Sequence, residues 1–185
     1  MAVGRGVRGP GSSPALTTGL ASPVDIAALV ELASTTFRDA YRDLLDAQEI
    51  EDYIAAHFTR ATLSATLADS SSRWITAAKD GRPLGYALLR DSQPPPCVLG
   101  PMPIELGRLY VRQEVMGTGC GLALMRAVQA EARKLHRRTL WLAVYDRNVR
   151  AIDFYRKFGF VEVGTTDFRF GGRVYADPVM AAAVR

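Results

Sequence analysis

The stretch that decides how this chain folds is Leu109-Tyr110-Val111-Arg112-Gln113-Glu114-Val115-Met116-Gly117-Thr118-Gly119-Cys120-Gly121-Leu122. An apolar run ends a predicted strand, a glycine-rich turn follows, and a predicted helix begins at once. Glycine backbones can point consecutive N–H groups into one cavity, and a helix N-terminus adds unpaired N–H groups. Such a turn binds phosphate or pyrophosphate, or it only lets helix and sheet pack closely. The segment favours phosphate binding.

Two common nucleotide motifs are absent from this turn. A dinucleotide-binding fingerprint needs a third glycine at its sixth position, but the sixth residue counted from Gly117 is Leu122. A P-loop needs Gly-Lys followed by serine or threonine, and the sequence contains no such run. A nucleotide-binding domain for ATP or NAD is therefore disfavoured.

The whole chain predicts one mixed α/β domain over residues 15–185, after a Gly/Pro/Ser-rich tail at 1–14 that we expect to be disordered. The order of predicted elements is α-rich first, then a strand hairpin, then alternating strands and helices, which places helices on both faces of one sheet. The predicted elements are strand 15–20, helices 23–39, 46–57 and 60–68, strands 73–78, 83–90 and 104–111, helix 117–136, strand 139–145, helix 149–158, strand 160–166 and a last strand within 168–181.

Composition disfavours several classes of protein. No apolar run approaches the roughly 20 residues that a membrane-spanning helix needs, and residues 1–14 lack the apolar segment of a secretory signal. The chain has two cysteines without CxxC spacing and two histidines, so we expect no metal site and no disulfide framework, and a cytoplasmic location. The basic residues are not interleaved with an aromatic stripe, so we expect no nucleic-acid partner.

Charge is distributed unevenly along the chain, whose formal net charge is +4. Residues 21–60 hold eight acids and three bases, whereas residues 103–185 hold eight acids and fourteen bases. This split indicates either ordinary solvated helix faces, or an acidic side for a cationic substrate and a basic side for a polyanionic cofactor.

Two blocks resemble the GCN5-related N-acetyltransferase (GNAT) superfamily. Met116–Gly121 fits both glycines of the family's Q/R-x-x-G-x-G/A signature and departs from it at Met116. Asn148–Phe160 matches the family's N-x-x-A-x-x-F-Y-x-x-x-G-F run. The resemblance covers residues 15–183 and is closest to the bacterial spermidine/spermine N-acetyltransferase-like branch, although Ala176 replaces the threonine usual before Asp177.

The resemblance implies a mixed, mostly antiparallel sheet of about six or seven strands and acetyl-CoA as cosubstrate. It also implies an enzyme that transfers an acetyl group to a primary amine by direct attack. The implied contacts to acetyl-CoA are Leu109, Tyr110, Val111, Met116, Gly117, Thr118, Gly119, Cys120, Gly121, Leu122 and Asn148.

The resemblance makes Tyr155 the acid that protonates the leaving thiolate, and its alternative role is that of a core aromatic. An amine with a pKa near 10 must lose a proton before it attacks, so a base is needed. Glu105, on the strand leading into the site, is the candidate base. The alternative is that Glu105 is only an exposed strand carboxylate. The residues expected to line an acceptor pocket, or to pack between helices, are Phe37, Tyr41 and Tyr53.

A polyamine or another small cationic amine is the expected acceptor. The alternatives are an acetyltransferase for protein N-termini or lysines, and a CoA-binding sensor without catalysis. Self-association into a homodimer is left open.

Overall fold

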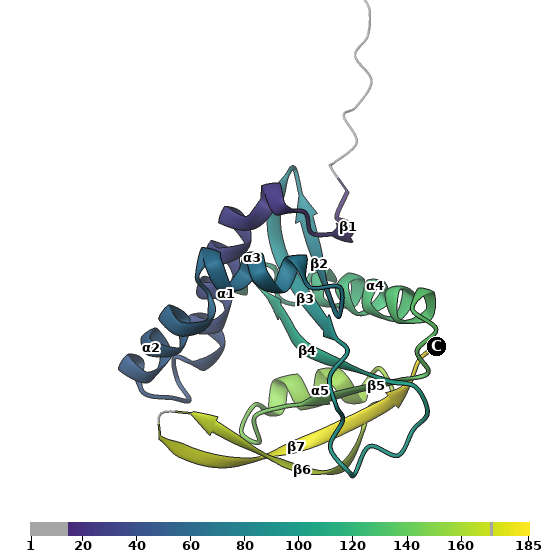
Figure 1. The fold of residues 1–185 in the computed structure, drawn as a ribbon. Coiled ribbons are helices and arrows are strands. Elements are labelled where there is room, and N and C mark those ends of the chain that lie inside the picture. The colour runs from purple at the N-terminus through teal and green to yellow at the C-terminus, as the bar shows by residue number, and fades with distance from the viewer. Residues whose placement is uncertain (1–14, 171) are drawn as a thin grey trace, which may run out of the picture.

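One seven-stranded sheet, in the order β1-β2-β3-β4-β5-β7-β6, runs through residues 15–170 and 172–185, which the computed structural model describes. The expected tail at 1–14 lies outside the described residues. The elements are β1 Thr17–Leu20, α1 Ile26–Tyr41, α2 Ala47–His57, α3 Arg60–Ala68, β2 Ser72–Lys79, β3 Arg82–Arg90, β4 Pro103–Val111, α4 Cys120–Lys134, β5 Thr139–Ala143, α5 Val149–Arg156, β6 Val161–Phe170 and β7 Arg173–Ala183 (Figure 1). Short 3₁₀ turns lie at Pro23–Asp25 and Gln113–Val115.

Every pair of neighbouring strands is antiparallel except β4 and β5. The expected mostly antiparallel α/β sheet is confirmed.

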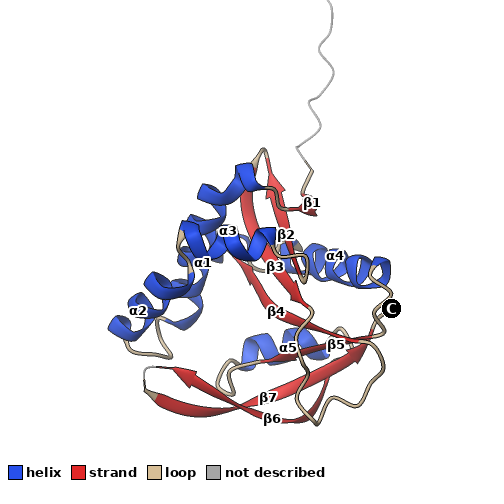
Figure 2. Cartoon of the chain, in the orientation of Figure 1, coloured by secondary structure: helices blue, strands red, loops and turns tan. Residues whose placement is uncertain are grey.

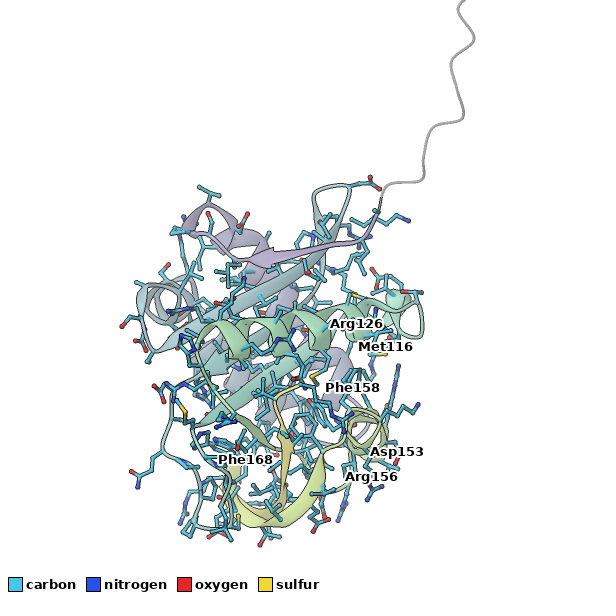
Figure 3. The ribbon with its side chains drawn as sticks, turned by 90° about the vertical axis from the view of Figure 1, so that its right-hand side faces the viewer. Met116, Arg126, Asp153, Arg156, Phe158 and Phe168 are labelled. Carbon is cyan, nitrogen blue, oxygen red and sulfur yellow. The ribbon has the colours of Figure 1, made fainter. Side chains whose placement is uncertain are left out.

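Helices cover both faces of the sheet, and an apolar cluster lies between the helices and the sheet on each face (Figure 2). The strand β3 shows the division, because Ala87 and Leu89 belong to the cluster that includes α4 and α5, whereas Leu88 between them belongs to the cluster of α1, α2 and α3. Successive strand residues point to opposite faces. In Figure 3, α4 lies in front of the sheet and the N-terminal helices lie behind it.

The strands β4 and β5 pair over only three residues and then separate. Their register joins Pro103 with Thr139, Ile104 with Leu140 and Glu105 with Trp141, and no pairing follows (Figure 1). A bulge lies just beyond, since Leu88 opposes Arg108 while Leu89 opposes Leu106, which leaves Gly107 as the extra residue. The separation opens the sheet in the middle of the molecule.

The structure corrects two predicted boundaries. The helix expected from residue 117 begins at Cys120, because Gly117 and Gly119 have φ values of 81° and 94°, outside the helical range. The strand expected at 160–166 continues to Phe170 as β6, and β7 begins only at Arg173. Gly172, with φ of 74°, lies in the turn between them.

Candidate active site

A cavity of 550 Å³ occupies the opening between β4 and β5. Its wall combines α1, the separated part of β4, the glycine turn, the end of β5 and α5. The lining residues are Thr36, Asp39, Ala40, Tyr41, Asp43, Leu106, Gly107, Arg108, Leu109, Tyr110, Val111, Gln113, Met116, Gly117, Gly119, Gly121, Leu122, Ala143, Val144, Asn148, Arg150, Ala151, Phe154 and Tyr155. Most of the expected acetyl-CoA contacts therefore face one space, although Thr118 and Cys120 are not among the lining side chains.

The N-terminus of α4 presents unpaired donors to this cavity. Gly119 is its N-cap and has no side chain to satisfy them, so the N–H groups of Cys120, Gly121 and Leu122 have no partner inside the helix. A Cβ added at Gly119 or at Gly117 would meet nothing within 4 Å. These N–H groups, together with the positive end of the helix dipole, fit a pyrophosphate group.

Two expected donors of the same turn are used internally. The backbone N–H of Met116 donates to the backbone carbonyl oxygen of Gln113 at 3.2 Å, and that of Thr118 donates to the backbone carbonyl oxygen of Val115 at 3.3 Å. Anion binding through the backbone therefore falls to the first turn of α4.

The separated edge of β4 supplies a second set of backbone groups. Leu106 to Val111 pair with β3 on one side and have no β5 partner on the other. Backbone groups on that side can hydrogen-bond an extended ligand in the way a neighbouring strand would. The pantetheine arm of CoA carries amides that suit this edge.

The helix α5 brings Asn148 and Tyr155 to the cavity. Asn148 caps the helix, because its Oδ1 accepts the Ala151 N–H at 3.1 Å. Tyr155 is 9% exposed, and burial raises the pKa of its hydroxyl. The hydroxyl therefore keeps its proton near neutral pH, as a proton donor must.

Glu105 is not brought into the cavity. Glu105 is the last residue of β4 that pairs with β5, and it is buried. Its carboxylate accepts hydrogen bonds from Arg90 Nη2 and Ser92 Oγ, both at 2.7 Å. Its carboxylate is thus held by an ion pair outside the lining. Glu105 could act as base only if it left these partners.

Of the three expected acceptor residues, Tyr41 alone lines the cavity. Its hydroxyl lies 3.4 Å from that of Tyr110. Phe37 and Tyr53 stack on each other, with ring centroids 4.6 Å apart, in the apolar cluster behind it. Phe37 also packs against the Tyr41 ring, so this aromatic pair lies behind the part of the cavity wall that Tyr41 forms.

Several lining residues escaped the sequence analysis, among them Asp39, Asp43, Gly107 and Arg108. The glycine inside an apolar strand was the available signal for a bulge. The Arg108 guanidinium lies 4.6 Å from the Phe58 ring centroid and forms no ion pair among the described residues. It places a positive charge in the wall near α1.

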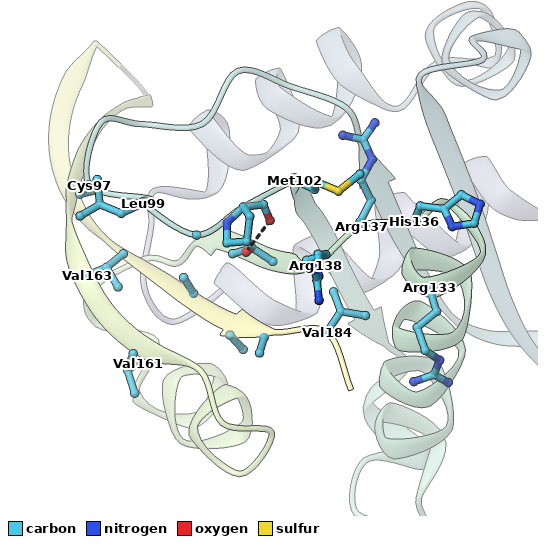
Figure 4. Close-up of a pocket in the computed structure, with 16 residues that line it drawn as sticks. Cys97, Leu99, Met102, Arg133, His136, Arg137, Arg138, Val161, Val163 and Val184 are labelled. Carbon is cyan, nitrogen blue, oxygen red and sulfur yellow. Dashed lines mark hydrogen bonds between the residues drawn. The ribbon is translucent and has the colours of Figure 1, made fainter.

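A second, more open cavity of 1250 Å³ lies where the 97–102 loop, the end of α4 and the outer strands meet (Figure 4). It combines apolar side chains such as Leu99, Val161 and Val163 with Arg133 and Arg138. Within the described residues, no helix is long and apolar enough to cross a membrane, and no group of three or more metal-ligating side chains is gathered.

The family model for "Acetyltransferase (GNAT) family" matches residues 26–160. An uncharacterized N-acetyltransferase of Mycobacterium tuberculosis is 34% identical over 157 residues, which is 82% of this chain and 93% of that protein. The spermine/spermidine N(1)-acetyltransferase of Bacillus subtilis is 28% identical over 66 residues, 35% of this chain and 43% of that protein.

Among solved structures, the PaiA N-acetyltransferase from Thermoplasma acidophilum in complex with coenzyme A has a TM-score of 0.76 at 21% identity. The match covers 91% of this chain and 99% of that one, and it shows the shared fold. The opened sheet with its glycine turn, the family match and the 34% identical relative agree. The chain is an acyltransferase enzyme that belongs to the GNAT family of N-acetyltransferases.

Proposed function

We propose that the enzyme transfers the acetyl group of acetyl-CoA to a primary amine by direct attack of the amine on the thioester. The supporting observation is that the unpaired N–H groups of α4 and the unpaired edge of β4 face the same cavity as Tyr155. The first two suit the pyrophosphate and the pantetheine arm of one extended molecule. The Tyr155 hydroxyl lies in the same cavity, where it can protonate the leaving thiolate.

The proposed roles follow the wall of the cavity. The first turn of α4, from Cys120 to Leu122, holds the pyrophosphate, Leu109 to Val111 pair with the pantetheine arm, and Asn148 orients α5 next to it. Tyr155 donates a proton to the thiolate as the C–S bond breaks. Burial raises the pKa of this hydroxyl, so it remains protonated at the pH of turnover but is a weaker acid than a free phenol; its position in the cavity wall, and not its pKa, supports the role.

For the acceptor we propose a polyamine or another small cationic amine. Asp39 and Asp43 line the cavity where α1 ends, although Asp39 is paired with Arg42. Exposed carboxylates attract a cation and raise its local concentration. We further propose that the enzyme works in the cytoplasm, and we leave homodimer formation to measurement.

Arg108 favours a second acceptor class, an amine that also carries a carboxylate. A guanidinium without an ion pair binds a carboxylate well and repels one end of a polyamine. Its position in the cavity wall beside α1 is the observation that supports this class.

A thiol-release assay with acetyl-CoA tests the proposal against spermidine, a basic amino acid and a short peptide with a free N-terminus. We expect release above the acceptor-free rate with at least one amine. Release with the peptide alone would support a protein acetyltransferase. No release with any amine, combined with calorimetric binding of CoA, would support the non-catalytic sensor.

A further inference from the structure

Asp177 is a buried carboxylate that the proposed roles above do not use. It lies on β7, is 5% exposed, and its Oδ1 has no hydrogen-bond partner among the described residues. It forms no ion pair with any lysine or arginine in residues 15–170 and 172–185. A buried carboxylate oxygen without a partner costs stability, so its presence needs an explanation.

The backbone next to Asp177 is joined to the cavity wall. The Val144 N–H donates to the Pro178 oxygen at 3.1 Å, and Val144 lines the cavity just after β5 ends. This hydrogen bond continues the β5–β7 pairing, which joins Ala143 with Val179. Asp177 therefore lies at the end of β5 where the sheet opens.

The side chains of β7 show which face of the sheet Asp177 occupies. Tyr175 packs against the aromatic cluster of α1, α2 and α3, and Met180 belongs to the cluster of α4 and α5. The register of β7 with β6 advances without a bulge in β7 between these residues. Asp177 thus shares the face of Tyr175, whereas Tyr155 belongs to the opposite cluster. Asp177 is not itself a lining residue: it lies behind the wall, close enough for its charge to act on the lining residue Tyr41, on the face opposite to Tyr155.

Three tyrosine rings, those of Tyr41, Tyr145 and Tyr175, form a group near Asp177. Tyr145 lies edge-on to Tyr175, with ring centroids 5.4 Å apart, and 6.3 Å from the Tyr41 ring. The negative charge of Asp177 contributes to raising the pKa of both Tyr41 and Tyr145. A carboxylate beside aromatic rings suits an ammonium group, which is attracted to both.

Burial raises the pKa of Asp177 to about 6, and the charge of Asp146 adds to the rise while the Asp146 backbone opposes it. The other titratable groups around Asp177 are Tyr41 on α1, Tyr145 and Arg147 after β5, Tyr175 on β7 and the exposed Asp167 on β6. A base whose pKa lies near the working pH accepts protons efficiently and is ionised at pH 7.

We propose that Asp177 is the general base of the acetyl transfer, accepting a proton from the acceptor ammonium through one water. This inference rests on the proposed function. The ammonium gives one proton to Asp177, which passes it to solvent. The neutral amine then forms the C–N bond as the C–S bond breaks. The nitrogen loses its second proton to solvent after the C–N bond has formed, and solvent returns one proton to Tyr155, whose own proton has gone to the thiolate.

The test is Asp177→Asn, compared with Asp167→Asn as a matched control on the exposed neighbouring strand. With spermidine near pH 7 we expect kcat/KM to fall about 30-fold in Asp177→Asn, with CoA affinity unchanged by calorimetry. The wild-type and Asp167→Asn profiles should show an acidic limb at about pH 6 that Asp177→Asn lacks.

A weakly basic amine separates proton removal from a structural role. When fluorine substitution keeps the acceptor neutral at the assay pH, Asp177→Asn and wild type should react within about threefold of each other. An equal loss with both amines would overturn the proposal. A large loss in Glu105→Gln with an intact acidic limb in Asp177→Asn would overturn it as well and assign the base to Glu105.

Two measurements do not depend on turnover. Asp177→Asn should melt at or above the wild-type temperature at pH 7, because it removes an ionised buried group that is stabilised by a backbone hydrogen bond from Asp146 and by no ion pair among the described residues; a lower melting temperature would indicate a structural carboxylate. Carboxyl NMR should show Asp177 titrating at about 6, and an ordinary pKa would overturn the proposal. If wild type acetylates no amine, the proposed function fails. The melting temperature and the carboxyl titration still test whether Asp177 is a buried carboxylate with a raised pKa.

Discussion

The two walls of the cavity are built in different ways. The wall proposed to bind the pyrophosphate comes from the consecutive residues Met116 to Leu122, and its donors arise from one helix N-terminus. The opposite wall draws Tyr41 from α1, Arg108 from β4 and Val144 from the end of β5. The first wall is local in sequence, and the second exists only after distant elements have packed together.

This difference indicates how each wall responds to change. A substitution in the local wall acts directly on the cofactor through backbone and charge, and leaves the acceptor side in place. A substitution in the assembled wall should change acceptor binding both through direct contact and by disturbing the packing of the elements that form the wall. Variants in each wall test that separation.

Gly119→Asp should abolish most cofactor binding. A carboxylate at the N-cap of α4 would stand where the pyrophosphate is expected, and the two negative charges would repel each other. We expect calorimetry to show CoA affinity reduced by about 100-fold or more, roughly 2.7 kcal/mol.

The control for this substitution is Gly81→Asp in the β2–β3 turn. Gly81 also has positive φ, 74° against 94° for Gly119, and an added Cβ there also meets nothing within 4 Å. Backbone strain is therefore similar in both variants. Equal CoA affinity in Gly119→Asp and Gly81→Asp would show that the local wall does not hold the cofactor.

Tyr155→Phe should reduce kcat by about 10- to 100-fold and leave acetyl-CoA affinity nearly unchanged, because only a group used in the transition state is removed. Tyr86→Phe is the control, since Tyr86 is buried on the other face, its hydroxyl has no hydrogen-bond partner within residues 15–170 and 172–185, and it does not line the cavity. Full kcat in Tyr155→Phe, with chemistry limiting the rate, would make the hydroxyl structural.

Asp43→Asn tests charge on the acceptor wall. Asp43 is exposed, lines the cavity and forms no ion pair among the described residues. We expect kcat/KM for spermidine to fall about threefold at low salt and the difference to vanish at high salt, where exposed charges are screened.

Asp80→Asn in the remote β2–β3 turn should show no such change. A preference for the basic amino acid over spermidine, with flat salt dependence, would contradict the polyamine proposal and support recognition by Arg108.

Met116→Gln should have the smallest effect, a change in acetyl-CoA affinity of about twofold or less, equivalent to roughly 0.4 kcal/mol. The Met116 N–H already donates to Gln113, and the substitution leaves that hydrogen bond in place. Calorimetry provides the measurement. A loss of about tenfold would show that the Met116 side chain, rather than the backbone of α4, carries binding at this position.

Much of the sheet could be predicted from sequence because its strands are short apolar runs bounded by turn residues. The hairpin from β2 to β3 and the glycine turn before α4 are examples. The bulge at Gly107 was not predicted, and it matters because one extra residue changes which side chains of β4 face the cavity. Leu106 belongs to the cluster of α4 and α5, whereas the Arg108 guanidinium lies over Phe58 in the other cluster, although residues two apart in a regular strand share a face.

The sequence by itself determined the proposed anion-binding end of the cavity, because glycine conformations and unpaired helix N–H groups are local properties of residues 116–122. Only the tertiary structure decided the partners of the carboxylates. Glu105 and Asp177 are both acids on strands, yet the register of β4 with β3 places Glu105 opposite Arg90, while the β5–β7 pairing leaves Asp177 buried without a cation. Cross-strand neighbours depend on pairing between segments far apart in the chain, which no local pattern encodes.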